Sequence, residues 1–259
     1  MKLAELRERY VEKGRALPKE IEEQLAQDGR AEAQRLLAAI HKRRKANRTE
    51  GQRLRHMLKY EQVWIARGMT LIAGVDEAGM SPLAGPVVAG AVILPLDYKL
   101  KALDDSKKVD AETREKLAVE IKRNAIAWAF GIAEVKEIDT INIYHAGLLA
   151  MRRAVEGLQV TPQVLLIDAR KLKDLPQPQQ AIIGGDGKSL SIAAASIIAK
   201  TTRDAMMREL DGEFPGYGFA KHKGYGVPEH LRALAKLGCT PMHRTSFGPV
   251  KPYLLMVNT

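Results

Sequence analysis

Hydrophobic and polar positions divide the chain into two segments with different patterns. In residues 1–70 the apolar residues recur at the three- and four-residue spacing of amphipathic helices, and almost no stretch reads as a strand. From residue 70 onward, short continuous apolar runs alternate with helical stretches, as in α/β domains. The pattern therefore predicts a helical N-terminal extension over residues 1–69 and an α/β domain over residues 70–259.

The α/β segment contains five predicted strands separated by helical stretches. We expect strands at 71–78, 87–94, 127–135, 163–169 and 180–186, and helices at 111–125, 138–158, 191–210 and 227–238. The first two strands are close enough along the chain to pair antiparallel. The helix between the third and fourth strands favours a right-handed parallel crossover.

The chain carries a strong positive charge, much of it in the N-terminal segment. The formal net charge is +10, and residues 1–70 hold 17 Lys and Arg against 10 Asp and Glu. Residues 41–48, HKRRKANR, form a basic cluster that we place between two helices. This charge suits a polyanionic partner, above all nucleic acid, although a solvated helix face without a partner has the same pattern.

Cysteine content and the length of apolar runs exclude several classes of protein. Cys239 is the only cysteine, so neither an intrachain disulfide nor a zinc–cysteine cluster can form. No apolar run approaches the roughly 20 residues of a membrane span, and the charged start lacks the apolar core of a signal peptide. We expect a cytoplasmic protein. Nothing in the sequence indicates an oligomer or a protein partner, so we expect a monomer.

Acidic side chains follow three of the predicted strands. Asp76 and Glu77 end the first strand, Asp168 ends the fourth, and Asp186 follows the fifth. Ligands of α/β sheets commonly lie beyond the carboxyl ends of the strands. Four carboxylates in a small space need a cation to stay ionised, and two ions of Mg²⁺ or Mn²⁺ suit phosphodiester cleavage. Each acid alone is more often a helix cap or a turn residue.

Six longer motifs occur in collinear order over residues 70–250. They are GVDEAG at 74–79, PLAGPVVA at 82–89, DSKK at 105–108, SLSIAAASIIAK at 189–200, PGYGFAKHKGYG at 215–226 and HRTSF at 243–247. Together they resemble bacterial ribonuclease HII, a type 2 ribonuclease H, and the N-terminal segment resembles the extension of some bacterial members. The resemblance implies a ribonuclease H-like fold, a mixed five-stranded sheet flanked by helices.

The resemblance also implies an activity. Members of the family hydrolyse the RNA strand of RNA–DNA hybrids and cut beside ribonucleotides embedded in duplex DNA, as in ribonucleotide excision repair, leaving 3′-hydroxyl and 5′-phosphate ends. By motif, the catalytic and metal-binding acids fall on Asp76, Glu77, Asp168 and Asp186, the four that the strand ends indicate. A hybrid-binding module with little catalysis, and a nuclease of the same fold acting on DNA, stay open as alternatives.

Three substrate contacts follow from the resemblance. Tyr225 matches the tyrosine that stacks near the sugar of the deoxynucleotide after the ribonucleotide, although a partly buried loop tyrosine would look the same. Lys107 and Lys108 match the DSKK stretch that approaches a substrate phosphate, although they also read as a plain exposed pair.

The start of the long helix is a further candidate contact. Lys188 and Ser189 precede this helix, whose N-terminal amides favour an anion such as a phosphate. A simpler interpretation makes Ser189 or Ser191 the N-cap of the helix, and both interpretations can hold.

Other polar residues are weaker candidates. Asp204 rivals the fourth metal-binding position, but its place inside the long helix beside Arg203 favours a structural role. His222, His230 and His243 are candidates for a proton shuttle, although metal-bound water reduces the need for one.

The loop after the two adjacent acids departs from the family pattern. The family usually has Gly-Arg-Gly where this chain has Gly79, Met80 and Ser81, and there the loop backbone reaches the 2′-hydroxyl and the phosphate at the RNA–DNA junction. Met80 brings no charge to a phosphate, and Ser81 adopts a positive φ less readily than glycine. We therefore expect hydrolysis to be retained and junction selection to weaken. A second departure, Ala169 and Arg170 where glycine is common, has no consequence that the sequence predicts.

Overall fold

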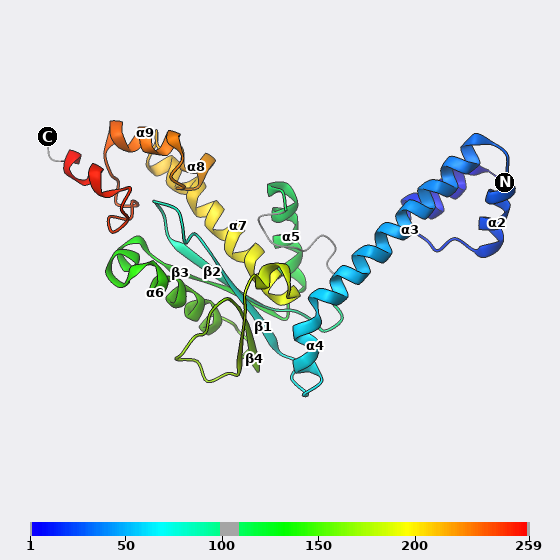
Figure 1. The fold of residues 1–259 in the computed structure, drawn as a ribbon, viewed down its shortest axis with the longest axis horizontal. Coiled ribbons are helices and arrows are strands. Elements are labelled where there is room, and N and C mark those ends of the chain that lie inside the picture. The colour runs from blue at the N-terminus through cyan, green and yellow to red at the C-terminus, as the bar shows by residue number, and fades with distance from the viewer. Residues whose placement is uncertain (1, 99–108, 258–259) are drawn as a thin grey trace. The chain divides into compact units, whose positions relative to one another are not determined.

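The computed structural model describes residues 2–98 and 109–257, and the chain folds into two compact units, Met1–His56 and Met57–Thr259 (Figure 1). The predicted phosphate contacts Lys107 and Lys108 lie outside the described residues. No helix within the described ranges is long and apolar enough to cross a bilayer.

Helices make up the first unit. They are α1 (Leu3–Arg7), the π-helix η1 (Glu8–Glu12), α2 (Lys19–Gln27) and most of α3 (Ala31–Met57). Their apolar faces enclose a small core that includes Leu6, Leu25 and Ile40. The basic cluster 41–48 was expected between two helices, but it lies within α3. Lysine, arginine and alanine are good helix formers, and no glycine or proline interrupts the cluster.

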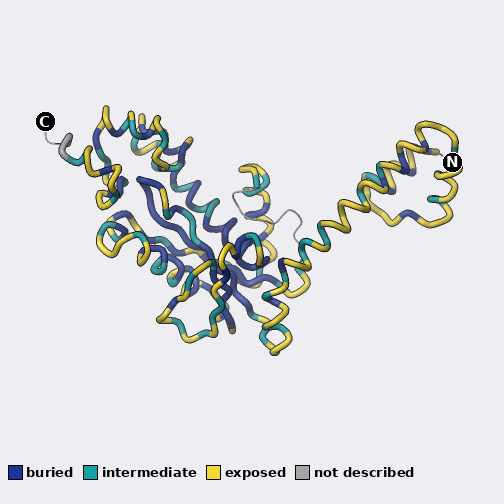
Figure 2. Tube along the Cα trace, in the orientation of Figure 1, coloured by how far each residue is buried: buried dark blue, intermediate teal, exposed yellow. Residues whose placement is uncertain are grey.

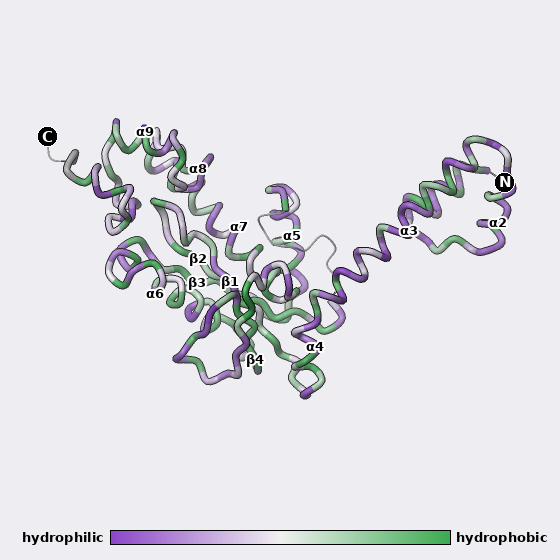
Figure 3. The backbone as a smooth tube through the Cα atoms, viewed as in Figure 1, coloured by the Kyte–Doolittle hydropathy of each residue, from purple (hydrophilic) through white to green (hydrophobic). Residues whose placement is uncertain are grey.

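Five strands form one mixed sheet in the second unit. They are β1 (Ile72–Ala78), β2 (Val87–Ile93), β3 (Ala127–Ala133), β4 (Val164–Asp168) and β5 (Gln179–Ile182), in the order β3-β2-β1-β4-β5. The pairs β1–β2 and β2–β3 are antiparallel, as expected for the first pair, and β1–β4 and β4–β5 are parallel. The central strands are buried and mostly hydrophobic (Figures 2 and 3). The mixed sheet flanked by helices is the predicted ribonuclease H-like fold.

Helices cover both faces of this sheet. The two longest are α6 (Val135–Glu156) and α7 (Leu190–Glu213), and the others are α4 (Lys59–Ile65), α5 (Ala111–Asn124), α8 (Phe219–His222), α9 (Pro228–Leu237) and the 3₁₀ helices η2 (Gly185–Gly187) and η3 (Lys251–Val257). A Cβ on Gly131 would lie 2.3 Å from Ala150 O of α6, and a Cβ on Gly74 would lie 2.0 Å from the Ser191 carbonyl carbon of α7. Glycines thus let both helices pack directly on the strands.

The helix α4 packs on the sheet although it lies in the segment expected to form the extension. Tyr60, Trp64 and Ile65 contact the apolar cluster formed by β1, β4, β5 and α7. Trp64 Nε1 also donates to Gln180 Oε1 at 2.9 Å. The domain boundary after residue 69 stays a prediction, but any truncation that removes α4 also removes part of this packing.

The close approach of α7 gives a testable stability difference. Replacing Gly74 by alanine should lower the free energy of unfolding by about 3 kcal/mol, because the added methyl group meets backbone atoms that cannot move aside. Replacing Gly212 by alanine adds a methyl group within α7 where nothing lies within 4 Å, and should stabilise the protein by about 0.5–1 kcal/mol. Denaturant unfolding measures both values, and equal values for the two variants would contradict the packing argument.

Candidate active site

Two neighbouring parallel strands bring their terminal acids to the same edge of the sheet. Val75 of β1 pairs with Ile167 of β4, so Asp76 and Asp168 are the next residues of their strands at that edge. The strand expected at 180–186 is shorter in the structure, because β5 ends at Ile182. A turn through Gly184, which has a left-handed backbone conformation, then leads to Asp186. Gly185 N then donates to Asp168 Oδ1 at 2.7 Å, which joins the segment of Asp186 to the end of β4.

The four predicted acids share one electrostatic environment. Asp76 and Asp186 are buried, with 5% and 8% of their surface exposed. Burial raises the pKa of Asp76 well above its usual value, and the nearby carboxylates of Glu77, Asp168 and Asp186 raise it further. Burial also raises the pKa of Glu77, against the opposing influence of the Arg170 guanidinium. The structure thus brings these acids together.

The donor set fits a hard divalent cation. Within the described ranges, no three or more His, Cys, Asp or Glu side chains are already arranged to hold an ion. Groups of the protein contact these acids, and one of them is Arg170, whose Nη2 lies 3.2 Å from Glu77 Oε1. Glu77 Oε2 is buried without a hydrogen-bond partner. A cation would satisfy this oxygen and relieve the repulsion that raises the pKa of Asp76.

Two buried arginines hold the loop that follows the acids. Arg244, fully buried, donates from Nη2 to Gly79 O at 2.6 Å, from Nη1 to Met80 O at 3.2 Å and from Nε to Gly85 O at 3.0 Å. Arg203 donates to Pro86 O and Ala84 O, both at 3.0 Å. Their acceptors are carbonyl oxygens, so both guanidinium groups shape the backbone of this loop.

Arg203 and a main-chain hydrogen bond connect the loop to the segment of Tyr225. Arg203 Nη1 also donates to Lys223 O at 3.0 Å, and Leu83 N donates to Gly224 O at 2.8 Å. Tyr225 follows directly and is 42% exposed. Hydrogen bonds therefore join the later part of the loop that contains residues 79–81 to the segment of Tyr225.

The three histidines lie in a cluster that contacts the main chain of Tyr225. His222 and His230 stack with ring centroids 4.6 Å apart, and His230 Nε2 lies 3.0 Å from His243 Nε2. His230 Nδ1 lies 2.9 Å from Tyr225 O. Burial lowers the pKa of His243 to about 4, so its imidazole is neutral at pH 7. Their hydrogen bonds give these histidines a place in the packing that supports Tyr225.

Ser189 and Lys188 have partners within the protein. Ser189 is fully buried, caps α7 by accepting from Ile192 N at 3.3 Å, and donates to Glu61 Oε1 at 2.7 Å. Ser191 N also donates to Glu61 Oε1, at 3.0 Å. The Glu61 carboxyl group thus occupies the start of α7, where the sequence suggested a phosphate. Lys188 is exposed, and its Nζ donates to Ile183 O.

Asp204 and Ala169 occupy structural positions. Asp204 Oδ1 lies 2.6 Å from Lys200 Nζ, and its Oδ2 lies 3.5 Å from an Arg114 nitrogen. Ala169 has a φ of 51°, in the left-handed region that glycine adopts most readily. The resemblance led us to expect glycine at this position, and the left-handed backbone conformation gives a physical reason for that glycine.

Sequence reasoning missed the contacts of Arg170, Arg244 and Glu61. Arg244 lies within the HRTSF motif, but the motif did not show which groups Arg244 contacts. Arg170 and Glu61 lie outside the six motifs, so the sequence held no comparable signal for them.

The fold and the site define a class of protein. A ribonuclease H-like sheet whose parallel strands end at clustered acids is the architecture of a metal-dependent phosphodiester hydrolase. A family model for "Ribonuclease HII" matches residues 73–250, and one for "Ribonuclease HII N-terminal domain" matches residues 2–64. The chain belongs to the ribonuclease HII family and is a metal-dependent endoribonuclease.

Similar proteins include two bacterial ribonucleases HII. One from Anaeromyxobacter sp. (strain Fw109-5) is 59% identical over 98% of this chain and 81% of that protein, and one from Myxococcus xanthus (strain DK1622) is 58% identical over 97% and 86%. The crystal structure of ribonuclease H2 from Pyrococcus horikoshii OT3 matches with a TM-score of 0.63 at 23% identity, over 71% of this chain and 97% of that one. This structural match supports the fold.

Proposed function

We propose that this endoribonuclease hydrolyses the RNA strand of RNA–DNA hybrids and cuts at ribonucleotides embedded in duplex DNA, leaving 3′-hydroxyl and 5′-phosphate ends. Asp76, Glu77, Asp168 and Asp186 would hold two divalent ions, Mg²⁺ or Mn²⁺. Bound ions of this kind activate water and stabilise the leaving oxygen of a phosphodiester. The observation that supports this most directly is the convergence of four acids at one sheet edge, where three of them raise the pKa of the fourth.

Backbone amides orient two of these acids. Glu77 N donates to Asp76 Oδ1 at 2.7 Å, and Gly187 N donates to Asp186 Oδ1 at 3.0 Å. Fixed carboxylate orientations reduce the reorganisation needed when a cation and a phosphate enter. On the substrate side, exposed Tyr225 and the loop at Gly79, Met80 and Ser81 would contact the sugars at the cut, and Lys188 a phosphate.

A cleavage assay tests this function. We expect Mg²⁺- or Mn²⁺-dependent cutting of an RNA–DNA hybrid and of duplex DNA with one ribonucleotide, and no cutting of all-DNA duplex. Cutting of the DNA duplex would contradict the proposal. The alternative of a hybrid-binding module with little catalysis is not favoured, given the family membership. We expect the enzyme to act as a monomer in the cytoplasm.

The Gly79-Met80-Ser81 loop should set the preference between substrates. Met80 packs against the core over Gly147, where a Cβ would lie 3.0 Å from Met80 Sδ, and Ser81 is not among the described residues with positive φ. The backbone path therefore tolerates Ser81, and the missing charge at Met80 should matter more. Replacing Met80 by arginine should raise the preference for a single ribonucleotide over an all-RNA hybrid by about tenfold.

The ratio of kcat/KM for the two duplexes measures this preference. Met80→Leu is the control and should leave the ratio unchanged, because it alters shape without adding charge. Adding Ser81→Gly to Met80→Arg should change the ratio little. An unchanged ratio in both arginine variants would refute the role of Met80.

The first unit should add affinity for nucleic acid through only part of its basic cluster. Arg43 and Arg44 donate to main-chain carbonyls, including Tyr10 O at 2.6 Å and Leu17 O at 3.0 Å, so they stabilise the fold. Besides Arg44, the exposed cations of the cluster are Lys42, Lys45 and Arg48. Replacing these three by alanine should weaken hybrid binding about tenfold and lower the slope of log Kd against log salt by up to about 3.

Binding over a salt series measures both quantities. The matched control replaces Arg7, Arg9 and Arg15, which removes the same charge from other exposed positions of this unit. Equal slopes in the two triple variants would leave the cluster with a structural role only.

A further inference from the structure

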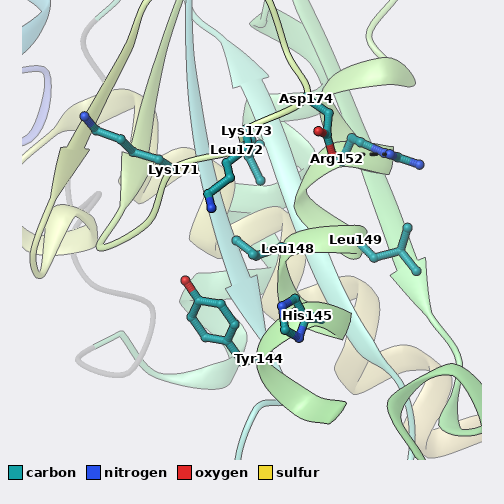
Figure 4. A pocket seen from close by; sticks show the side chains of 9 residues that line it. All are labelled: Tyr144, His145, Leu148, Leu149, Arg152, Lys171, Leu172, Lys173 and Asp174. Carbon is teal, nitrogen blue, oxygen red and sulfur yellow. Dashed lines mark ion pairs between the residues drawn. The ribbon is translucent and has the colours of Figure 1, made fainter. Parts of the chain in front are cut away.

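A groove with a volume of about 330 Å³ lies between α6 and the loop that follows β4 (Figure 4). Its polar lining comes from both elements. Tyr144, His145 and Arg152 belong to α6, and Lys171, Lys173 and Asp174 belong to the loop. None of these six residues is among the predicted site residues.

The groove is positively charged along most of its length. Lys171 and Lys173 are exposed, and Arg152 Nη1 lies 3.8 Å from Asp174 Oδ2. This ion pair lies on one side of the view in Figure 4, and Lys171 and Tyr144 lie on the other. The two lysines have no carboxylate within ion-pair distance in the described part of the chain. The surplus of cations suits an anionic chain.

The aromatic side of the groove is held in place. Asn142 has a φ of 65° inside α6, and its Oδ1 accepts from Tyr144 N at 3.0 Å and from His145 N at 3.2 Å. The backbone conformation of Asn142 interrupts α6, and its side chain caps the helical segment that follows. The Tyr144 ring is presented to solvent with 53% of its surface exposed. An exposed, ordered aromatic ring beside cations is the arrangement that holds single strands of nucleic acid.

One residue connects the groove to the catalytic acids. The Arg170 guanidinium lies over the Tyr144 ring, with Cζ 4.9 Å from the ring centroid, and its Nη2 pairs with Glu77 Oε1 at 3.2 Å. Arg170 Nη1 is buried and has no hydrogen-bond partner. The Arg170 side chain is 16% exposed, and its positive charge would attract a phosphate beside Glu77. Arg170 thus links Tyr144 of the groove to Glu77 by direct contacts.

We propose that this groove is a backbone subsite for the nucleic-acid strand that is cut. Lys171 and Lys173 contact its phosphates away from the cut, Tyr144 packs on a sugar or base, and Arg170 binds the phosphate nearest the acids. The cut strand is the occupant because Arg170, which contacts the groove residue Tyr144, also pairs with Glu77, one of the acids proposed to act at the cut. This inference rests on the proposed function.

Steady-state cleavage of an RNA–DNA hybrid over a salt series tests the subsite. The double variant Lys171→Ala, Lys173→Ala should lower kcat/KM about five- to tenfold with kcat within about twofold, and should lower the salt slope by about 2. The control Lys122→Ala, Arg123→Ala removes the same charge from the last turn of α5, which precedes β3 at the opposite edge of the sheet. Equal kinetics in the two double variants would overturn the proposal.

Methylphosphonate substitution identifies the strand. Neutralising single phosphates of the cut strand should lower kcat/KM of the unaltered enzyme at one or two positions away from the cut, and these effects should disappear in the lysine variant. Effects that persist in the lysine variant, or that occur only with the complementary strand, would overturn the assignment. If the unaltered enzyme did not cut the hybrid, the proposed function itself would be refuted. That outcome is distinct from failure of the subsite alone.

Discussion

Replacing Asp76 by asparagine should abolish cleavage of an RNA–DNA hybrid while making the metal-free protein more stable. Asparagine keeps the shape of the side chain but removes the charge that a divalent cation requires. The loss in kcat should reach at least about 10³-fold, as for other groups on which a catalytic site depends. The opposite effects on activity and stability are specific to a site built around repelling acids.

The stability gain should depend on pH with a definite sign. Burial and three neighbouring carboxylates raise the pKa of Asp76, so the folded chain holds a proton there more tightly than the unfolded chain. The stabilisation from the protonated form is complete below the unfolded pKa of about 3.9 and is lost as pH rises through the raised pKa. Asparagine stays neutral, so its advantage should grow with pH and reach about 3 °C in Tm or more.

Thermal unfolding in a chelator between pH 4 and pH 8 measures this gain, and hybrid cleavage measures the loss. Asp204→Asn is the matched control, because Asp204 is also buried on the same unit but pairs with Lys200 and Arg114. It should lower the free energy of unfolding by about 1–3 kcal/mol and retain activity. If Asp76→Asn destabilised the protein as Asp204→Asn does, the repulsion argument would fail.

Replacing Arg244 by alanine should lower the free energy of unfolding by about 3–5 kcal/mol. The side chain is fully buried, and it is the common donor to the carbonyl oxygens of Gly79, Met80 and Gly85. Burial, with a further contribution from Arg203, lowers the pKa of Arg244 to about 9, so the guanidinium is still charged at pH 7. Its removal leaves buried acceptors without donors.

Arg244→Lys separates charge from geometry. A lysine ammonium keeps the charge but cannot span carbonyl oxygens as the planar guanidinium does. We expect this variant to lose about half of the stability that the alanine variant loses, with a larger fall in kcat/KM for single-ribonucleotide duplexes than for all-RNA hybrids. Denaturant unfolding and the two cleavage assays measure these effects. Arg232→Ala, at an exposed position of α9, should change stability by less than about 0.5 kcal/mol.

The strands and acids could be predicted because they depend on local patterns. Apolar runs of strand length occur at β1, β2 and β4, and the acids follow them in the chain, so neither prediction needed a tertiary contact. Asp186 was harder, because the turn at Gly184 lies between it and the end of β5. The basic cluster 41–48 was misplaced because charge density carries no information about where a helix ends.

Motifs and periodicity were enough to predict the family, the α/β architecture and the four candidate metal-binding acids, since both are properties of neighbouring residues. The groups that support those acids depend on tertiary contacts. Arg244 contacts Gly79 across 165 positions of sequence, and Ser189 contacts Glu61 across 128. Such partners are chosen by packing, because a buried donor takes whatever acceptor the fold places within reach. For the same reason, Arg170 acquired its place between Tyr144 and Glu77 only in the folded chain.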